Sequence, residues 1–496
     1  MSALGVIAAG HPETVRRGAE VLREGGNAVD AALGAMLASF VCEPLLTGLG
    51  AGGYMLVVPP GESPTLLDFF VEAPGRGAPP PSRAELVPIT VSFGDAIQVF
   101  NIGAASVGTY GTPAGICAAA ARFGSVPLVE LCAPAAALAR EGVTLTAPQA
   151  YMVELLADIV TATPECAALF APDGGLLREG DTLHQPELGD SLELLGAEGA
   201  APFYSGEVGA AIVAWVGDRG GLLSAEDLDA YAVVDREPAR TRYRGRDVLT
   251  NPPPSAGGVL IAYALSVLDA DPGAPSVKRI VEAMERVQSE RTPEFLAGLD
   301  DPGFVERFLG RARASLGSTT HIAVIDRAGW ACSVTCSTGS SSGEVVPGTG
   351  IHLNNMLGEQ DLNPLGFHRH PPGRRLPSMM APTIVLREGA AELVLGSAGS
   401  NRIRSAILQT IIRVIDEGMR AGPAVEAPRV HFEDGVVYAE PGVDTDVLKD
   451  AGWAIGRFRE RNLFFGGAQA VQRDASGGFF GGGDPRRGGD AVVVEG

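Results

Sequence analysis

Two threonines, Thr319 and Thr320, stand at the head of a stretch whose residue types could do chemistry. A threonine hydroxyl within a chain is a weak nucleophile and needs an adjacent base. At a chain terminus, threonine brings its own base: its α-amino group has an ordinary pKa of about 7.7–8.0 and can take the hydroxyl proton. A backbone break before Thr319 would therefore create an acyl-transfer nucleophile. Taken alone, paired threonines equally indicate an ordinary strand.

The segment after Thr319 predicts a β-hairpin. Residues Thr320–Asp326 alternate and are rich in β-branched types, Arg327–Gly329 reads as a turn, and Ala331–Ser337 alternates again. A second strand pair is predicted at Thr383–Arg387 and Glu392–Leu395.

A glycine-containing loop, Gly396–Asn401, follows this second pair. After it, apolar residues recur at helical spacing (Ile403, Ile407, Ile411, Val414, Ile415). A loop at the start of a helix directs backbone N–H groups toward negative charge that develops during a reaction. An ordinary helix cap by Ser400 or Asn401 is a compatible reading.

The elements that position these segments are predicted to be helices and strands in layers. Thr14–Arg23 and Ala28–Phe40 read as helices separated by Gly25-Gly26, with Asn27 as the cap of the second helix. A glycine-dense turn then leads into the strand Tyr54–Val58. Residues 115–300 read as mostly helical, and residues 79–101 and 217–258 as long surface connections. Together these patterns predict a layered α/β architecture.

Composition is typical of a globular protein. The 496 residues are 46% hydrophobic and 20% charged, with a net charge of −21. Such a charge disfavours nucleic acid and anionic membrane surfaces as partners. No targeting segment and no apolar run of about 18 residues is visible, so no transmembrane helix is expected and the localisation is predicted to be cytoplasmic.

The potential metal ligands are too few and too scattered for a site. The six cysteines are expected to be small buried hydrophobes, and Cys332 with Cys336 supplies only two sulfurs. His368 and His370 lie in a Pro- and Gly-rich loop without a third ligand, and we expect them to face solvent. No metal and no cofactor is predicted.

The chain resembles the γ-glutamyltransferase family of N-terminal-nucleophile hydrolases. The run Thr319–Ser337 is similar to the family signature, in which the first threonine becomes a new N-terminus. Three further stretches match in order: Gly26–Ala32 with Glu43-Pro44 and Gly48–Gly53; Gly350–Asn355; and Leu376–Pro382 with Gly396–Ile403. The resemblance implies a four-layer αββα sandwich. It also implies self-cleavage between Ser318 and Thr319 into a large subunit, residues 1–318, and a small subunit, residues 319–496.

The resemblance carries the catalytic roles over position by position. Thr319 would be the nucleophile in self-cleavage and in turnover. Ser337 stands where the family has a second threonine, whose hydroxyl contacts the nucleophile. Gly399 and Ser400 stand where two glycines supply the backbone N–H groups of the oxyanion hole, and serine is acceptable there if its backbone angles are not restricted to glycine.

The substrate-binding positions depart from the family. Phe70 replaces the arginine that holds a substrate α-carboxylate, and a phenyl ring supplies no bidentate cation. Arg76 and Arg83 are the nearby cations that would have to substitute for it. Four further family positions are altered and one is kept: Gly339 replaces an asparagine, Met356 a glutamine, Glu359 an aspartate and Pro377 a serine, while Ser378 remains.

Three functions follow from the resemblance and its departures. The first is a γ-glutamyl hydrolase or transferase acting on glutathione-like compounds. The second is an amidase or acylase on another acyl group, such as a secondary-metabolite or oxamate-like amide, which the lost polar contacts favour. The third is an uncleaved, non-catalytic scaffold, which the retention of Thr319, Ser337 and Gly399 disfavours. Only 20 residues separate Asn355 from Leu376, so the site resembles that of lidless members and should be open.

Overall fold

Two antiparallel sheets form the centre of the molecule. The computed structural model describes residues 3–77, 85–92, 97–289, 319–363 and 366–496. In spatial order, the seven-stranded sheet contains β22 (Asp490–Glu495), β1 (Ala3–Ala9), β11 (Thr320–Asp326), β12 (Ala331–Ser337), β2 (Gly52–Val58), β3 (Thr65–Phe69) and β8 (Val234–Arg236). The six-stranded sheet contains β21 (Phe479–Gly483), β20 (Gly467–Arg473), β16 (Ala390–Ala398), β15 (Thr383–Arg387), β10 (Arg246–Thr250) and β9 (Ala239–Tyr243). Each sheet therefore combines strands from before and after Thr319.

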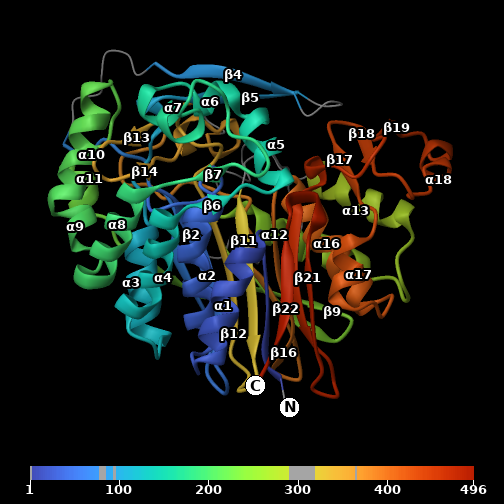
Figure 1. Ribbon diagram of the computed structural model, residues 1–496. Coiled ribbons are helices and arrows are strands. Elements are labelled where there is room, and N and C mark those ends of the chain that lie inside the picture. Colours follow the sequence, from blue (N-terminus) through green and yellow to red (C-terminus); the bar gives the residue numbers. More distant parts are fainter. Residues whose placement is uncertain (1–2, 78–84, 93–96, 290–318, 364–365) are drawn as a thin grey trace.

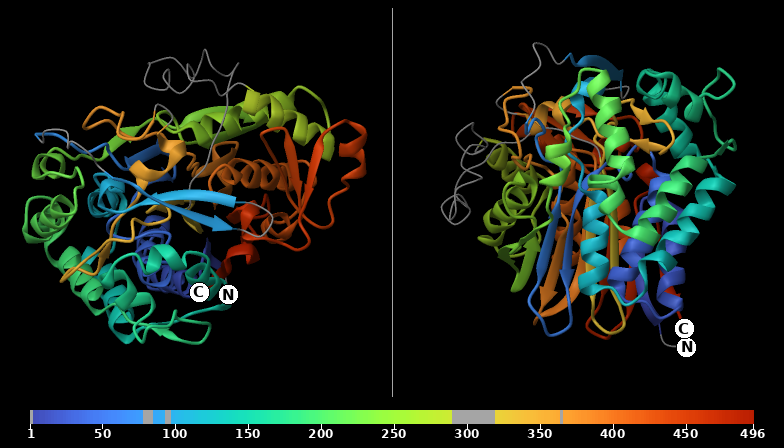
Figure 2. Two further views of the ribbon diagram at one scale, coloured as in Figure 1. Left: turned by 90° about the horizontal axis from the view of Figure 1, so that it is seen from above. Right: turned by 90° about the vertical axis from the view of Figure 1, so that its left-hand side faces the viewer.

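Helices cover the outer face of each sheet (Figures 1 and 2). Beside the seven-stranded sheet lie α1 (Pro12–Arg23), α2 (Ala28–Cys42), α3 (Thr112–Phe123), α4 (Leu128–Glu141), α5 (Ala147–Leu155), α6 (Ala157–Val160), α7 (Pro164–Phe170), α8 (Pro186–Glu198), α9 (Ala201–Tyr204), α10 (Glu207–Asp218) and α11 (Ala225–Asp229). Beside the six-stranded sheet lie α12 (Ala256–Asp269), α13 (Val277–Ser289), α16 (Arg402–Ile415), α17 (Ala421–Glu426) and α18 (Asp446–Asp450). Smaller sheets pair β4 (Val87–Ser92) with β5 (Ile97–Ile102), β6 (Val143–Thr144) with β7 (Thr182–Leu183), β13 (Val345–Val346) with β14 (Ile351–His352), and β17 (Val430–Glu433) with β18 (Val436–Ala439) and β19 (Ala454–Arg457).

Three hydrophobic clusters join the layers. One packs helices against the seven-stranded sheet, one packs helices against the six-stranded sheet, and the third lies between the sheets. Strand β11 divides its side chains accordingly: Ile322 and Val324 belong to the helical cluster, while Ala323 and Ile325 belong to the inter-sheet cluster. This order of layers confirms the predicted αββα sandwich.

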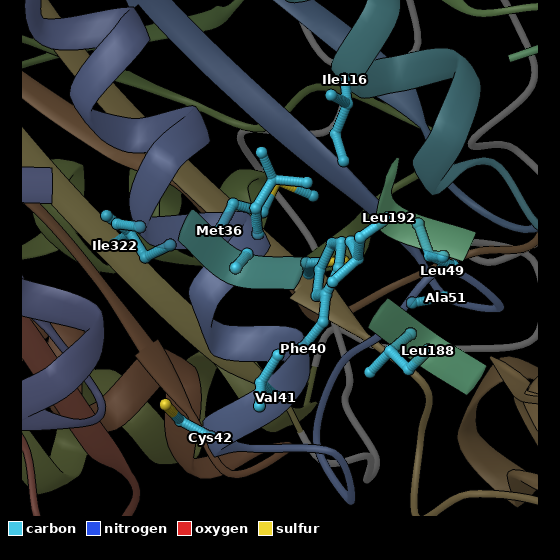
Figure 3. Packing of buried hydrophobic residues seen from close by; sticks show 14 of the residues in the cluster. Met36, Phe40, Val41, Cys42, Leu49, Ala51, Ile116, Leu188, Leu192 and Ile322 are labelled. Carbon is cyan, nitrogen blue, oxygen red and sulfur yellow. The ribbon is translucent and has the colours of Figure 1, made fainter. Parts of the chain in front are cut away.

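Helix α2 supports the strand that begins beside Thr319. Asn27 and Asp30 form a reciprocal capping box at its start, as the sequence predicted for Asn27. Every residue of α2 is buried because the helix lies between β11 and the outer helices. Figure 3 shows Met36 and Phe40 of α2 in the same cluster as Ile322 of β11.

The predicted local elements are confirmed in the main, with three corrections. Both predicted strand pairs are present, as are the helices at 12–23 and 28–42. Strand β16 continues to Ala398, so the loop that was predicted from Gly396 is shorter. Residues 217–258 are not one long connection, because they contain α11, β8, β9 and β10. Part of the 79–101 connection is the hairpin β4–β5.

The cysteines and the two loop histidines are buried or partly buried in the fold. Five cysteines are buried, and Cys117 is partly buried. His370 is buried, contrary to the expectation of a solvent-facing side chain, and its Nε2 lies 2.8 Å from the Leu362 carbonyl oxygen. The half-buried His368 places its Nε2 2.8 Å from the Ala105 carbonyl oxygen.

Among the helices of the described residues, none has the length and apolar character needed to cross a bilayer.

Candidate active site

Thr319 and Ser337 face each other at the end of the central hairpin. Strands β11 and β12 pair Thr320 with Cys336, and extending this register by one residue places Thr319 opposite Ser337. Both side chains are buried, each with 2% of its surface exposed. The two predicted residues therefore line the same cavity although 17 residues separate them along the chain. Ser318 lies outside the described residues.

A cavity of about 300 Å³ lies in front of Thr319. Seven predicted site residues line it: Thr319, Ser337, Phe70, Gly339, Met356, Glu359 and Ser378. The sequence did not predict four apolar members of its wall: Leu362, Met379, Met380 and Ile403. A signal existed for two of these, since Met379 and Met380 directly follow the predicted Ser378. The cavity is apolar apart from Glu359 and the hydroxyls.

Glu359 is the ionisable group in this wall. Its Oε1 accepts hydrogen bonds from the Ser340 backbone N–H at 3.2 Å and from Ser340 Oγ at 3.3 Å. Burial raises the pKa of Glu359 to about 7, and the bonds from Ser340 and the Asn355 side chain limit the rise. At neutral pH this carboxyl is thus divided between its neutral form, which can donate a hydrogen bond, and its charged form, which can accept a cation.

Gly339 leaves room for this carboxyl. Its φ is +73°, and a Cβ there would collide with Asn355 Oδ1 and lie 3.1 Å from Glu359 Oε1. The Gly339 N–H donates to Ser337 Oγ at 2.9 Å, so the turn also holds the Ser337 hydroxyl in place. An asparagine at position 339 would have to displace both Asn355 and Glu359.

Phe70 presents an aromatic ring where the resemblance implies a cation. Its ring stacks on Tyr54 with centroids 5.4 Å apart. Its carbonyl oxygen accepts from Tyr231 Oη at 2.8 Å and from Arg375 Nη1. Arg76 does not substitute, because its guanidinium pairs with Glu72 at 3.0 Å outside the cavity wall. Arg83 lies outside the described residues.

Ser378 lies at the rim, where α12 begins. Its Oγ accepts from the Met380 N–H at 2.9 Å, and its carbonyl oxygen accepts from the Ala256 N–H at 2.8 Å. These bonds fix the backbone that carries Met379 and Met380 along the cavity. The Ser378 hydroxyl thus has a structural role within the wall.

The loop before α16 holds the predicted oxyanion residues. Gly399 and Ser400 have φ of +107° and +70°, and their carbonyl oxygens accept from the Arg402 and Ile403 N–H groups. The Ser400 angle is the left-handed region, which serine can adopt at a cost of about 1–2 kcal/mol. Neither residue lines the cavity itself, whereas Ile403 in the first turn of α16 does. The structure thus places the loop one turn from the cavity.

Thr320 points to the opposite face of β11. Its Oγ1 donates to Glu43 Oε2 at 2.5 Å, and Thr14 Oγ1 donates to Glu43 Oε1 at 3.4 Å. Burial raises the pKa of Glu43 to about 7. The sequence offered Glu43 only as part of the Glu43-Pro44 motif, because no local pattern shows that it meets Thr320.

The neighbouring histidine does not line the cavity in front of Thr319. His321 Nδ1 lies 2.8 Å from Thr335 Oγ1, and burial lowers the pKa of His321 to about 3, which keeps the ring neutral. Across the described parts of the chain, no group of three or more His, Cys, Asp or Glu side chains could hold a metal ion.

The sequence is similar to curated enzymes over most of its length. It is 32% identical over 480 residues to an acylase ACY 1 proenzyme of Pseudomonas sp. (strain V22), with 90% of this chain and 85% of the relative covered. It is 30% identical over 544 aligned positions to a glutathione hydrolase proenzyme of Bacillus subtilis (strain 168), with 99% and 91% covered.

The fold is also similar to a solved structure. The cephalosporin acylase from Bacillus halodurans superposes with a TM-score of 0.82 at 26% identity and covers 100% of this chain and 96% of its own. The sequence profile of gamma-glutamyltranspeptidase matches residues 15–494. The chain therefore belongs to the gamma-glutamyltranspeptidase family of N-terminal-nucleophile hydrolases.

Proposed function

We propose that this protein is a self-processing amide hydrolase whose substrates carry an acyl group without an α-carboxylate. One observation carries the proposal: no arginine or lysine stands among the described residues that line the cavity in front of Thr319. A buried carboxylate without a cationic or hydrogen-bonding partner is costly, so a γ-glutamyl head group would bind poorly there.

The wall chemistry favours an apolar acyl group instead. Phe70, Met356, Leu362, Met379 and Met380 provide aromatic and flexible aliphatic surface, which packs against apolar groups of varied shape. Glu359 supplies one polar anchor. In its neutral form it can donate a hydrogen bond to a carbonyl or ether oxygen of the acyl chain. In its charged form it can accept hydrogen bonds from an ammonium group.

The reaction would proceed through an acyl-enzyme. Cleavage before Thr319 frees its α-amine, which takes the hydroxyl proton as the oxygen attacks the amide carbonyl. The backbone N–H groups of Gly399 and Ser400 would hold the negative charge on the carbonyl oxygen. The α-amine passes this proton to the departing nitrogen, the amine product leaves, and water then hydrolyses the ester to a carboxylic acid and restores the Thr319 hydroxyl. The Ser337 hydroxyl opposite Thr319 would orient the nucleophile. The products of cleavage would be a large subunit of residues 1–318 and a small subunit of residues 319–496.

A γ-glutamyl substrate is the second candidate. Glu359 and Ser378, two positions that the resemblance assigns to head-group binding, both line the cavity. A charged Glu359 would accept the α-ammonium of a γ-glutamyl group. The glutathione hydrolase proenzymes among the relatives are consistent with this substrate.

Matched anilides separate the two substrates. Purified, processed protein is assayed with hexanoyl and γ-glutamyl p-nitroanilide under the same conditions. We expect kcat/KM to be about tenfold or more higher for the hexanoyl compound, since the unpaired α-carboxylate weakens binding of the γ-glutamyl compound. A higher kcat/KM for the γ-glutamyl compound would reject the proposal in favour of the second candidate.

A denaturing gel with N-terminal sequencing tests the processing step. We expect two fragments, the smaller beginning at Thr319. A single full-length band after long incubation, together with no turnover of either anilide, would instead support the non-catalytic scaffold.

A further inference from the structure

We propose that a second cavity, on the opposite face of β11 from the nucleophile, binds a carboxylate that carries an alkyl or aryl tail. This cavity encloses about 670 Å³ of space, part of which is open to solvent, and shares no lining residue with the cavity in front of Thr319. Its wall is mainly apolar, with Leu145, Met152, Val153, Phe170, Leu183 and Leu463 among its members. An apolar tail would displace water from this wall and be stabilised in proportion to the area it buries.

Arg487 gives the cavity a partly buried cation. Its Nε and Nη1 are buried without a hydrogen-bond partner, and Nη2 makes a long contact of 3.5 Å to the Leu463 carbonyl oxygen. Within the described chain, no carboxylate lies within ion-pair distance of Arg487. Burial lowers the pKa of Arg487 to about 10, so it stays charged at neutral pH. A guanidinium with unpaired N–H groups on two of its nitrogens can donate charge-assisted hydrogen bonds to a carboxylate.

A second unpaired donor lines the same cavity. His11 Nδ1 accepts from the Glu13 N–H at 3.1 Å, which assigns the ring proton to Nε2. Nε2 is buried without a hydrogen bond of ordinary geometry, although the Gln149 side chain lies beside it. Burial lowers the pKa of His11, so the ring is a neutral donor.

Three other polar side chains of the wall have partners within the protein. Arg486 pairs with Glu440 and Asp484, and Gln149 bonds to Thr146 and to the Cys42 carbonyl oxygen. Glu43 accepts from Thr14 and Thr320. The unpaired nitrogens on side chains of the wall thus belong to Arg487 and His11. An acceptor-rich, anionic head group would pair with these nitrogens, whereas an amine would leave the Arg487 and His11 N–H groups unpaired.

The cavity also touches two parts of the catalytic frame. Glu43 bonds to Thr320, the residue after the nucleophile. Arg487 packs against Gly399, where a Cβ would lie 3.1 Å from its Nη2. A bound carboxylate would draw the Arg487 guanidinium toward itself, so occupancy is expected to change the turnover rate as well.

Binding of 4-phenylbutyrate to the processed protein tests the site. Isothermal titration calorimetry gives the dissociation constant, and a crystal soaked with the compound gives its position. We expect the carboxylate on Arg487 and the ring beside Met152 and Phe170. The neutral amide of the same acid should bind about tenfold more weakly, because it cannot form the charge-assisted pair.

Two variants and a matched control sharpen this test. Arg487→Gln removes the cation, and Met152→Trp fills the apolar end without touching the polar one; each should weaken binding about tenfold or more. Arg23→Gln changes an exposed arginine at the end of α1 and should bind like wild type. Melting curves show whether each variant is folded. If Arg487→Gln does not fold, the affinity of Met152→Trp tests the proposal by itself. Unchanged affinity in the folded variants, or density only in front of Thr319, would overturn the proposal.

Discussion

The two faces of β11 place adjacent threonines in different surroundings. Thr319 faces the space between the sheets, where Glu359 stands in an apolar wall. Thr320 faces the helical layer, where its hydroxyl donates a hydrogen bond to Glu43 and Arg487 lines a larger cavity. Burial raises the pKa of both glutamates to about 7, yet only Glu359 lies in the cavity of the nucleophile. Strand alternation thus separates neighbouring residues into a reacting side and a supporting side.

The largest effect is expected from removing the Thr319 hydroxyl. Thr319→Ala should abolish self-cleavage and lower turnover by about 10³-fold or more, because no other group can form the acyl-enzyme. The gel pattern and the rate with the preferred anilide measure both effects. Thr319→Ser keeps the hydroxyl and should still be cleaved. The same two fragments from Thr319→Ala would contradict the assignment.

The two glutamates should make stability depend on pH with the same sign. Each binds its proton more tightly in the folded protein, with a pKa of about 7, than in the unfolded chain, with a pKa of 4.5. The stability that comes from this proton is therefore full below about pH 4.5 and is lost as pH rises through 7, by at most about 3 kcal/mol for each group.

Glutamine variants isolate these contributions. Glu43→Gln and Glu359→Gln remove one titration each, so the melting temperature of each variant relative to wild type should rise between pH 5 and pH 8. Glu359→Gln should also change the pH profile of kcat/KM near pH 7, which Glu43→Gln should alter less. A constant difference in melting temperature across this range would mean that the carboxyl is charged throughout.

A smaller effect is expected from changing the aromatic residue in the wall. Phe70→Arg provides a guanidinium for an α-carboxylate, so the ratio of kcat/KM for γ-glutamyl to hexanoyl anilide should rise about tenfold. Phe70→Leu, which keeps an apolar side chain, should leave the ratio near the wild-type value. An unchanged ratio in Phe70→Arg would show that the head group lies elsewhere.

The smallest effect is expected from a change on the face of β11 that packs against the helices. Thr320→Val removes the hydrogen bond to Glu43 while keeping the shape of the side chain, and should lower the free energy of unfolding by about 1–2 kcal/mol. Turnover should fall by less than about tenfold, since the nucleophile remains. Chemical denaturation and the anilide assay measure the two quantities. A loss as large as that of Thr319→Ala would remove the distinction between the two faces.

Local sequence patterns predicted the elements that depend on local physics. The capping box at Asn27 and the alternation of Thr320–Asp326 each contain their own signal, and both elements are confirmed. Strand β1 gave no such signal, because it is flanked by β11 and β22 and is buried on both faces near its end. Residues 239–250 read as a connection because the strands there are short and flanked by Pro and Gly.

The residues of the candidate site likewise include some that the sequence predicted and some that it did not. The residue types and spacing from Thr319 to Ser337, with the family resemblance, identified seven members of the cavity wall before any fold was known. Ile403 and Leu362 were not predicted as members of the wall. An apolar residue on a helix or in a loop has the same sequence pattern whether it lines a cavity or packs in the core.

The sequence by itself determined the hairpin, its leading threonine and the absence of an arginine at position 70. Tertiary structure decided which groups face Thr319 and Thr320. Glu43 and Thr320 are 277 positions apart, and only the packing of α2 on β11 brings their side chains within hydrogen-bonding distance. The pKa of a carboxyl is likewise set by desolvation, which depends on the whole set of layers around it and not on its neighbours along the chain.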